Sequence, residues 1–427
     1  MVALGGHAVG PPGIVHYSGI VRAGLLEALN PMPDTRRTAE EILIDLVGFD
    51  TVSARSNLDL IEYIETYLVE LGVGSVRVAN DDGTKSNLYA TLGPAERSGV
   101  VLSGHTDVVP VANQPWETDP FVLTRRFVDD ELRLYGRGSA DMKGFIAAVM
   151  AMVPDFVEAD LQTPIHIAFS YDEEIGCLGV GRMIERMCGE LVRPQLVVIG
   201  EPTSMQIVTA HKGIQGFRTE ITGVAAHSSA PHLGVNAINY AAEIIRFLAE
   251  LAAEKQAQGD PENGFHPPWT TFNVGQIQGG EALNIIPEHC AFNWEFRPLP
   301  DEDTAAIKAR FDTFVAEQIE PRLRAENPLA TVVTRPLAAV PALHRDDNSP
   351  AERLARHLTG ANTTHTAAYV AEASQFQANG IPAVLCGPGN IDQAHQANEW
   401  IALAQLDECT DFLRRLLNWA ETGAPVP

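Results

Sequence analysis

Ser-Gly-His-Thr-Asp, at residues 103–107, follows a short apolar run, and Gly-Arg-Gly-Ser-Ala-Asp-Met-Lys-Gly, at residues 136–144, precedes a long one. Each segment places a metal-binding type of side chain, His105 or Asp141, beside glycines at the expected end of a strand. Side chains at the carboxyl ends of strands in an open α/β sheet meet in one crevice, so the two segments indicate a metal site. Asp107 lies where its carboxylate could orient the His105 imidazole. A single His-x-Asp pattern is more often a turn followed by a cap, so the interpretation depends on residues downstream.

The composition limits the classes of partner. With 427 residues the chain is too long for one ordinary core, and we expect two domains. There are 55 acidic and 30 basic residues, which gives a formal net charge of -25. Such a surface repels phosphate backbones and anionic lipids, so we expect neither nucleic acid nor a membrane as a partner. A cationic small molecule or metal ions remain compatible with this charge.

The cysteines and the amino-terminal segment bear on the compartment. The five cysteines have no paired spacing, which favours free thiols in a reducing compartment and excludes a thiolate metal cluster. Residues 1–30 lack the basic start and apolar core of a signal peptide, and no run of about 18 apolar residues occurs. We therefore expect a cytoplasmic protein whose residues 1–35 form an amino-terminal extension.

The pattern of the first half alternates helices and strands. Apolar residues at steps of three and four predict helices, and short apolar or alternating runs predict strands. The expected helices are 38–46, 57–71 and 143–157, and the expected strands are 75–78, 87–91, 99–103, 121–127, 132–135, 165–170 and 196–199. Acidic or imidazole side chains follow several of these strands, which is typical of a doubly wound α/β fold with a mixed sheet.

A different pattern begins near residue 213. In chain order it predicts strand, helix, strand, strand, helix and strand, at 217–221, 235–252, 270–277, 290–297, 303–322 and 330–335. This order is typical of an α+β, ferredoxin-like sandwich. The alternating pattern then returns, with a helix, a strand and a helix at 351–358, 383–386 and 402–420. We therefore expect a discontinuous domain of residues 36–212 and 339–427, interrupted by an inserted domain of residues 213–338.

Six side chains at the expected strand ends form a candidate metal centre: His105, Asp141, Glu173, Glu174, Glu201 and His395. Imidazoles and carboxylates without thiols suit zinc, cobalt or manganese at a catalytic centre better than a structural zinc. Three carboxylate ligands nearly neutralise two divalent ions, so the set fits two metals better than one. Two such ions need a shared bridging carboxylate, for which Asp141 is the best candidate.

The adjacent acids Glu173 and Glu174 indicate the reaction. Successive residues that leave a strand point in different directions, so one can bind metal while the other faces a water molecule. A general base beside such a water is the equipment of hydrolysis. The alternative is that residues 172–174 are simply a charged turn.

The chain resembles the M20 metallopeptidase and deacylase family over about residues 38–420. Six motifs occur in the family's order and at similar separations: His105-x-Asp107, Ala140-Asp-Met-Lys-Gly, Asp172-Glu-Glu, Gly200-Glu-Pro-Thr, Gly223 to His227 and Gln393-Ala-His. Within the family, the segments at 172–177 and 387–396 are most similar to the members that deacetylate N-acetylornithine.

The resemblance implies a role for each residue of the centre. His105 and Glu201 would hold one metal ion, and Glu174 and His395 the other. Asp141 would bridge the two ions, which are zinc or cobalt. Glu173 would be the general base and Asp107 a carboxylate behind the ligands. The family also carries a cis peptide bond after the bridging aspartate, here between Asp141 and Met142.

The resemblance also assigns residues of the inserted domain, which would act as a lid and a dimerisation domain. His227 resembles the histidine that reaches the active site of the neighbouring subunit in a homodimer. Asn284 and Arg297 resemble a substrate clamp that domain closure brings onto the substrate. The guanidinium of Arg297 suits the α-carboxylate of an amino acid, and Gly389 would contact the same carboxylate. From the sequence alone, His227 also fits a loop cap beside serines, and Arg297 an exposed strand residue.

The expected function is hydrolysis of a small N-acyl amino acid, with N2-acetyl-L-ornithine as the best match. Succinyl-diaminopimelate desuccinylase, aminoacylase and dipeptidase activities of the same family are alternatives. A metal-binding homologue without catalysis is a further alternative, against which the pair Glu173 and Glu174 argues.

Overall fold

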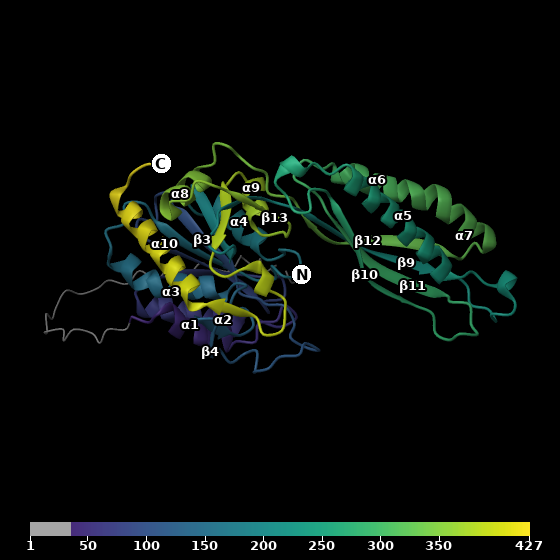
Figure 1. The fold of residues 1–427 in the computed structure, drawn as a ribbon, viewed down its shortest axis with the longest axis horizontal. Coiled ribbons are helices and arrows are strands. Elements are labelled where there is room, and N and C mark those ends of the chain that lie inside the picture. The colour runs from purple at the N-terminus through teal and green to yellow at the C-terminus, as the bar shows by residue number, and fades with distance from the viewer. Residues whose placement is uncertain (1–35) are drawn as a thin grey trace, which may run out of the picture. The chain divides into compact units, whose positions relative to one another are not determined.

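The computed structural model describes residues 36–427, whose strands form three sheets (Figure 1). The extension predicted at residues 1–35 lies outside the described residues. The largest sheet has eight strands in the order β1-β2-β6-β3-β7-β14-β8-β13. These strands are β1 (Ser75–Ala79), β2 (Ser86–Leu92), β3 (Val100–His105), β6 (Ile165–Ser170), β7 (Leu196–Pro202), β8 (Val208–His211), β13 (His365–Ala367) and β14 (Ala383–Gly387).

The centre of this sheet is parallel and its flanks are mixed. Strands β6, β3, β7 and β14 run parallel to one another, whereas β2 is antiparallel to β6 and β8 is antiparallel to β14. Parallel strands require crossover connections that cover both faces of a sheet. The predicted doubly wound mixed sheet is confirmed.

Strand β3 shows why both faces are apolar. Val100 and Leu102 belong to the core beneath one layer of helices, whereas Val101 belongs to the core on the opposite face. The first layer contains α1 (Ala39–Val47), α2 (Leu58–Glu70), α3 (Lys143–Glu158), α8 (Pro350–Thr359) and α10 (Leu403–Thr422), and the second contains α4 (Val180–Gly189) and α9 (Ala373–Ala378). Successive strand residues alternate between faces, so a strand covered twice reads as a continuous apolar run.

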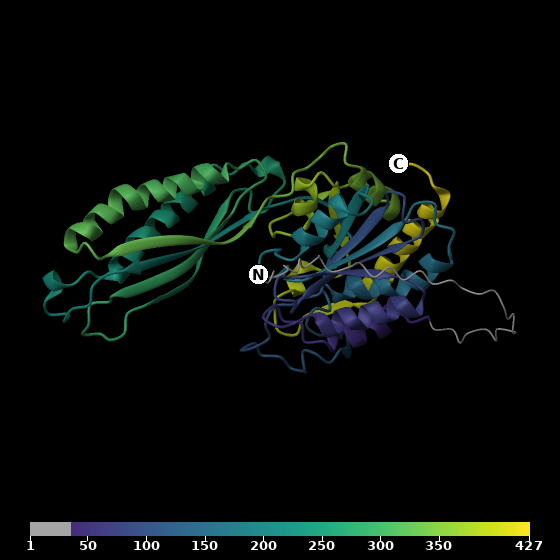
Figure 2. The same cartoon turned by 180° about the vertical axis from the view of Figure 1, so that it is seen from behind.

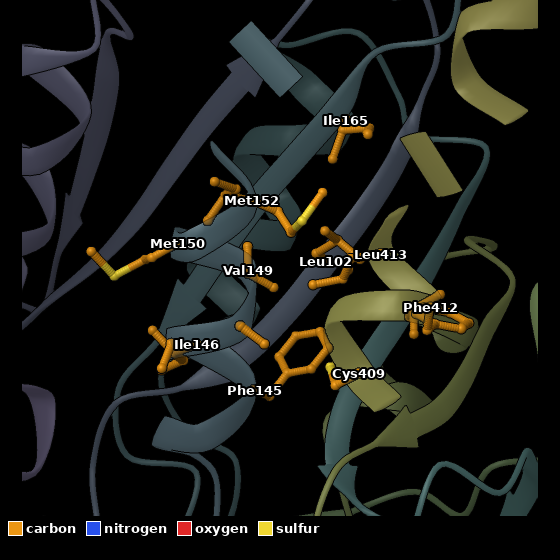
Figure 3. Close-up of a cluster of buried hydrophobic side chains, with 14 of the residues drawn as sticks. Leu102, Phe145, Ile146, Val149, Met150, Met152, Ile165, Cys409, Phe412 and Leu413 are labelled. Carbon is orange, nitrogen blue, oxygen red and sulfur yellow. The ribbon is translucent and has the colours of Figure 1, made fainter. Parts of the chain in front are cut away.

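Helix α3 is buried on nearly every side, as its sequence predicts. Figure 3 shows Phe145, Ile146, Val149 and Met152 of this helix together with Leu102 and with Phe412 and Leu413 of α10. The helix packs very closely on β7, because a Cβ atom added at Gly200 would lie 1.9 Å from the ring of Phe145. Residue 200 must therefore be glycine in this packing.

The inserted segment forms its own four-stranded antiparallel sheet, in the order β10-β11-β9-β12, with a separate apolar core. Its strands are β9 (Ile214–Thr222), β10 (Thr271–Gly279), β11 (His289–Arg297) and β12 (Thr331–Val340). Figures 1 and 2, from opposite sides, show α5 (Ala237–Ala257), α6 (Thr304–Phe314) and α7 (Glu320–Glu326) along one face. This is the α+β sandwich that the sequence predicts.

The single helix predicted at 303–322 is wrong in one respect. Residues Val315–Ile319 form a π-helical turn between α6 and α7. Pro321 lies just beyond this turn and has no backbone N–H for the bond to the residue four positions earlier. The hydrogen-bond ladder therefore shifts locally to a wider turn.

A third sheet, in the order β15-β5-β4, contains the strands predicted at 121–127 and 132–135. Strands β4 (Thr124–Val128) and β5 (Glu131–Tyr135) are joined by Asp129 and Asp130, both with positive φ. Strand β15 (Trp400–Ala402) pairs with β5 and was not predicted, because three residues are too few for a period. Within residues 36–427, no helix is both long and apolar enough to cross a membrane. The five cysteines are free, as predicted.

Candidate metal centre

Two groups of potential ligands meet at Asp141. The first comprises His105, Asp141 and Glu201, the second comprises Asp141, Glu174 and His395, and in each group the ligand atoms lie within 4.8 Å of one another. Oδ1 of Asp141 is 2.9 Å from Nε2 of His105, whereas Oδ2 is 3.4 Å from Nε2 of His395. Nε2 of His395 is also 2.9 Å from Oε2 of Glu174. One carboxylate thus offers a separate oxygen to each pocket, which is the geometry of a bridging ligand.

The ligands reach this point from different kinds of segment. His105 ends β3, Glu201 lies in β7, and Glu174 follows β6, so these three come from adjacent parallel strands as predicted. Asp141 and His395 come instead from loops, one that enters α3 and one between η4 (Ile391–Gln393) and β15. The expectation of a strand end for every ligand is therefore wrong for these two. The peptide bond between Asp141 and Met142 is cis, as the resemblance implies.

Negative charge is crowded in the centre. Burial and the neighbouring Asp141 raise the pKa of Glu174 to about 7, and the same two causes raise the pKa of Glu201 well above its ordinary value. Hydrogen bonds to Asp141 and Glu174 raise the pKa of His395 to about 10. Burial opposes the protonation of His105, yet the hydrogen bond and the charge of Asp141 raise its pKa. The carboxylates therefore draw positive charge towards themselves.

These residues fit two divalent cations. Oε1 of Glu201 is buried and has no hydrogen-bond partner among the described residues. A buried carboxylate oxygen without a partner is costly, and a cation within the His105, Asp141 and Glu201 group would satisfy it. Nitrogen and oxygen donors without thiolates suit zinc, cobalt or manganese. The donor set does not select among these metals.

Glu173 belongs to neither group of ligands and lies beside both. Sγ of the buried Cys177 donates to its Oε1 over 3.2 Å. Burial raises the pKa of Glu173 well above its ordinary value, although the charge of His105 opposes this shift. A carboxylate that is half-buried, next to the ligands and inclined to hold a proton has the properties of a general acid and base.

Asp107 contacts the centre in a way that differs from the prediction. Nδ1 of His105 donates to the main-chain carbonyl of Asp107 at 2.9 Å and is 3.7 Å from its carboxylate. That carboxylate instead accepts from the backbone N–H groups of Glu173 and Glu174, at 3.1 and 3.3 Å, and from the hydroxyl of Ser53 at 2.6 Å. The Asp107 side chain thus fixes the two adjacent acids, while its backbone orients the imidazole.

The residues predicted for substrate binding do not meet at one place in the chain. His227 is bridged to Ile285, and the backbone N–H of Ser228 donates to the carbonyl of Asn284, so His227 and Asn284 are neighbours. Arg297 ends β11 at the opposite end of the inserted sheet. Strand β11 has nine residues, so its two ends are about 25 Å apart. The structure therefore separates Asn284 from Arg297, which the sequence analysis joined in one clamp.

Gly389 lies against the loop that carries Asp141. Its φ is +84°, and a Cβ atom there would be 3.2 Å from the Cβ atom of Ala140. Its carbonyl accepts from the backbone N–H of Ser204, three residues after Glu201. The glycine is therefore near the centre and needs both its left-handed backbone and its small size.

Sequence reasoning missed Glu399, a buried acid whose carboxylate accepts from the backbone N–H of Asp141 at 3.0 Å. It also missed the buried Glu372, whose Oε1 has no partner among the described residues and whose charge raises the pKa of Glu173. The signal was weak in both cases, because a single acid next to a short strand or helix is common at a surface. Glu399 does lie four residues after His395, which is the one hint in the sequence.

Comparison with known proteins agrees with this geometry. Residues 101–419 match the profile of Peptidase family M20/M25/M40. The chain is 34% identical over 392 residues to an acetylornithine deacetylase of Myxococcus xanthus, an alignment that covers 90% of this chain and 98% of that protein. The chain belongs to the M20/M25/M40 peptidase family. It is 32% identical to an acetylornithine deacetylase of Pasteurella multocida, over 86% of this chain and 93% of the relative.

Solved structures of M20 proteins share the fold. An M20 family metallo-carboxypeptidase from Sulfolobus solfataricus superposes with a TM-score of 0.71 at 19% identity, covering 90% of this chain and 99% of that one. A dinuclear metal binding peptidase of the M20 family from Bacillus subtilis has a TM-score of 0.60 at 16% identity, covering 90% and 98%. The protein is thus an M20 hydrolase with a candidate dinuclear metal centre.

Proposed function

We propose that this M20 hydrolase removes the acetyl group of N2-acetyl-L-ornithine and releases L-ornithine and acetate. The observation that carries the proposal is Asp141, which offers one oxygen to each of two ligand groups with Glu173 beside them. Acetylornithine deacetylases among its relatives, at 32% and 34% identity over most of the chain, support the choice of substrate. The formal charge of -25 suits a substrate whose side chain is a cation.

The mechanism assigns two ions to the centre. His105 and Glu201 would hold one, Glu174 and His395 the other, and Asp141 would bridge them. When bound, zinc or cobalt would polarise the acyl carbonyl and lower the pKa of a nearby water. The protein must then place the substrate, move one proton and stabilise the negative charge that develops on the carbonyl oxygen.

Glu173 moves the proton. Its carboxylate accepts a proton from the attacking water as the new C–O bond forms at the acyl carbon. It then donates that proton to the amine nitrogen as the C–N bond breaks. The products are a carboxylic acid and an amine, and the acid's proton passes to the amine, which leaves a carboxylate and an ammonium group. The contact from Cys177 engages Oε1 of Glu173, so Oε2 is the oxygen that we assign to this task. The backbone N–H that Glu173 donates to Asp107 holds the residue in place.

The substrate-binding roles remain part of the proposal. The guanidinium of Arg297 would bind the α-carboxylate, since a planar fork of donors matches a carboxylate, and Gly389 would contact the same group. His227 would donate to the developing oxyanion, and Asn284 would bind substrate beside it. Because His227 and Asn284 lie about 25 Å from Arg297 along the strands, we assign them to the active site of a second subunit.

A substrate panel tests the proposal. The purified enzyme would be loaded with zinc or cobalt and assayed with N-acetylornithine, N-succinyl-diaminopimelate, N-acetylmethionine and a dipeptide. We expect kcat/KM for N-acetylornithine to exceed the others by at least about tenfold, because the acyl group and side chain both contribute to specificity. A chelator should abolish the activity, and added metal should restore it. A preference for another substrate would reassign the enzyme within its family, and no hydrolysis at all would favour a non-catalytic homologue.

A further inference from the structure

A buried acid outside the ligand groups holds the loop that carries Asp141. Oε1 of Glu399 accepts from the backbone N–H groups of Ala140 and Asp141, at 2.9 and 3.0 Å. Its Oε2 accepts from the backbone N–H of Gly138 at 2.9 Å and from Nη1 of Arg137 at 2.8 Å. Glu399 and Arg137 are each only 1% exposed. A carboxylate that accepts four hydrogen bonds fixes this loop firmly.

The guanidinium of Arg137 extends the contact to the other side of the centre. Its Nη2 donates to Oε1 of Gln114 at 2.5 Å, and Nε1 of Trp116 donates to the same oxygen at 3.0 Å. Nε2 of Gln114 in turn donates to the main-chain carbonyl of His395 at 3.1 Å. The chain of contacts therefore runs from the backbone of Asp141 to the backbone of His395.

His395 depends on such support more than the other ligands do. It lies in a loop with φ of +60°, a left-handed conformation that is uncommon for a residue with a side chain. Its side chain is 55% exposed, so packing holds the imidazole weakly compared with the buried His105. The position of its backbone therefore decides whether the imidazole faces Asp141 and Glu174.

We propose that Glu399, Arg137 and Gln114 form a positioning network that sets the geometry of both metal pockets, with one arm on Asp141 and one arm on His395. The inference rests on the proposed metal centre but not on the choice of substrate. None of the three residues is a ligand or touches a reacting atom in the proposed mechanism. They act through the backbones of the ligands, as partners behind a metal's ligands commonly do.

The two arms can be cut separately. Gln114→Glu keeps an acceptor for Arg137 and Trp116 but has no donor for the carbonyl of His395. It should therefore weaken the binding of one ion, the one assigned to Glu174 and His395. Glu399→Gln keeps an acceptor for Ala140 and Asp141 but loses the acceptor for Gly138 and Arg137. It should weaken the binding of both ions, because Asp141 belongs to both ligand groups.

Binding of cobalt and zinc to the metal-free protein would be measured by calorimetric titration and by competition with a chelator. We expect Gln114→Glu to bind one of the two ions about 10- to 100-fold more weakly and the other unchanged. Gln256→Glu, an exposed position on α5, and Glu96→Gln, an exposed loop position, are controls with the same changes of charge. Both controls should bind as the wild type does. Unchanged binding of both ions by Gln114→Glu would overturn the inference.

A purely structural role gives a different result. If Gln114 only stabilised the fold, Gln114→Glu would lower the thermal midpoint of the metal-free protein and weaken the binding of both ions equally. That result would also contradict the network. Should Glu399→Gln fail to fold, Arg137→Lys replaces it, since a lysine cannot bridge Glu399 and Gln114 together; unchanged binding there would refute the inference. The network and the proposed function can fail separately. If the wild type binds two ions but does not hydrolyse N-acetylornithine, and Gln114→Glu binds only one ion tightly, the proposed function is wrong and the network still stands.

Discussion

At the scale of single residues, the centre separates the candidate metal ligands from Glu173, the residue that we propose transfers a proton. Glu173 and Glu174 are adjacent, and both backbones are held by one carboxylate, that of Asp107. Only Glu174 lies within a ligand group. Consecutive residues with different tasks are possible because their side chains leave the backbone in different directions.

Replacement of Glu173 tests this separation. We expect Glu173→Gln to lower kcat by about 10²- to 10⁴-fold, because the amide cannot accept the proton of the attacking water. The variant should still bind two ions, since Glu173 belongs to neither ligand group. Steady-state kinetics together with the metal content of the purified protein would check both statements. Loss of metal along with activity would mean that Glu173 is a ligand and that its assigned role is incorrect.

Much of the site could be predicted at this scale. His105, Asp141, Glu174, Glu201 and His395 stand in recognisable motifs, and the structure brings all five together. The partners behind them, such as Glu399, could not be predicted, because a hydrogen bond to a backbone N–H leaves no signature in residue type or spacing. The assigned roles of His227, Asn284, Arg297 and Gly389 stay predictions.

At the scale of elements, the periodicity of the sequence predicted most helices and strands, because β3, β6 and α3 are buried and therefore strongly patterned. Helices α4 and α9 escaped prediction. Helix α9 has only six residues, fewer than two turns, and α4 has glycine and charge around a narrow apolar stripe. Three-residue strands such as β13 and β15 are defined by their partners and have no period of their own.

The contact between α3 and β7 leads to a prediction on stability. Gly200→Ala would push a methyl group into the ring of Phe145, 1.9 Å away, and should cost about 1–3 kcal/mol or more of unfolding free energy. Because Glu201 is the next residue, the same change should weaken metal binding. Urea unfolding would measure the loss, and Phe145→Leu should recover part of it in the double variant.

The matched control for this prediction is Gly189→Ala at the end of α4, where an added Cβ atom would meet nothing within 4 Å. We expect that variant to unfold at the same urea concentration as the wild type. Equal stability of Gly200→Ala and the wild type would show that the helix moves freely on the sheet.

A buried histidine on β6, His166, makes the stability of the fold depend on pH. His166 is 2% exposed, and burial lowers its pKa to about 4 from an ordinary value of 6.5. Between these values the unfolded chain binds a proton that the folded chain does not. Stability is therefore lost as the pH falls from 6.5 to 4, by about 3 kcal/mol in total. Urea unfolding of the metal-free protein at a series of pH values would show this slope.

His166→Asn should remove that part of the slope, because asparagine does not titrate and can still bond to Thr91, the present partner of the ring. His365→Asn, at an exposed position, serves as the control and should leave the slope unchanged. An identical slope in His166→Asn and the wild type would mean that other groups carry the acid sensitivity, among them His211, whose pKa burial also lowers to about 4.

At the scale of the whole molecule, the inserted sheet raises the question of subunits. His227 and Arg297 mark opposite ends of β11 and its neighbours, so one active site cannot use both from the same chain without a large rearrangement. A homodimer in which each subunit lends His227 to the other resolves this separation. The dimer and the boundaries at 212/213 and 338/339 stay predictions, because the order of elements predicts an insertion but no partner.

Mixing two inactive variants tests the shared site. We expect His227→Ala and Glu173→Ala to be inactive alone, whereas their co-expression should restore about a quarter of wild-type activity, because half of the dimers are mixed and each mixed dimer has one intact site. Gel filtration at micromolar concentration should give a dimer for each variant. Mixtures as inactive as their components would place His227 in the active site of its own chain, or outside any active site.

The candidate centre draws its ligands from both sides of the inserted segment, with His105, Asp141, Glu174 and Glu201 before it and His395 after it. During synthesis, four ligands therefore emerge long before the fifth, and the Glu399 that steadies Asp141 emerges later still. A nascent chain stopped within residues 213–338 lacks His395 and Glu399, so it has neither the complete second ligand group nor the carboxylate that holds the loop of Asp141. The order of the polypeptide thus means that the proposed two-metal centre can be complete only after synthesis has passed residue 399.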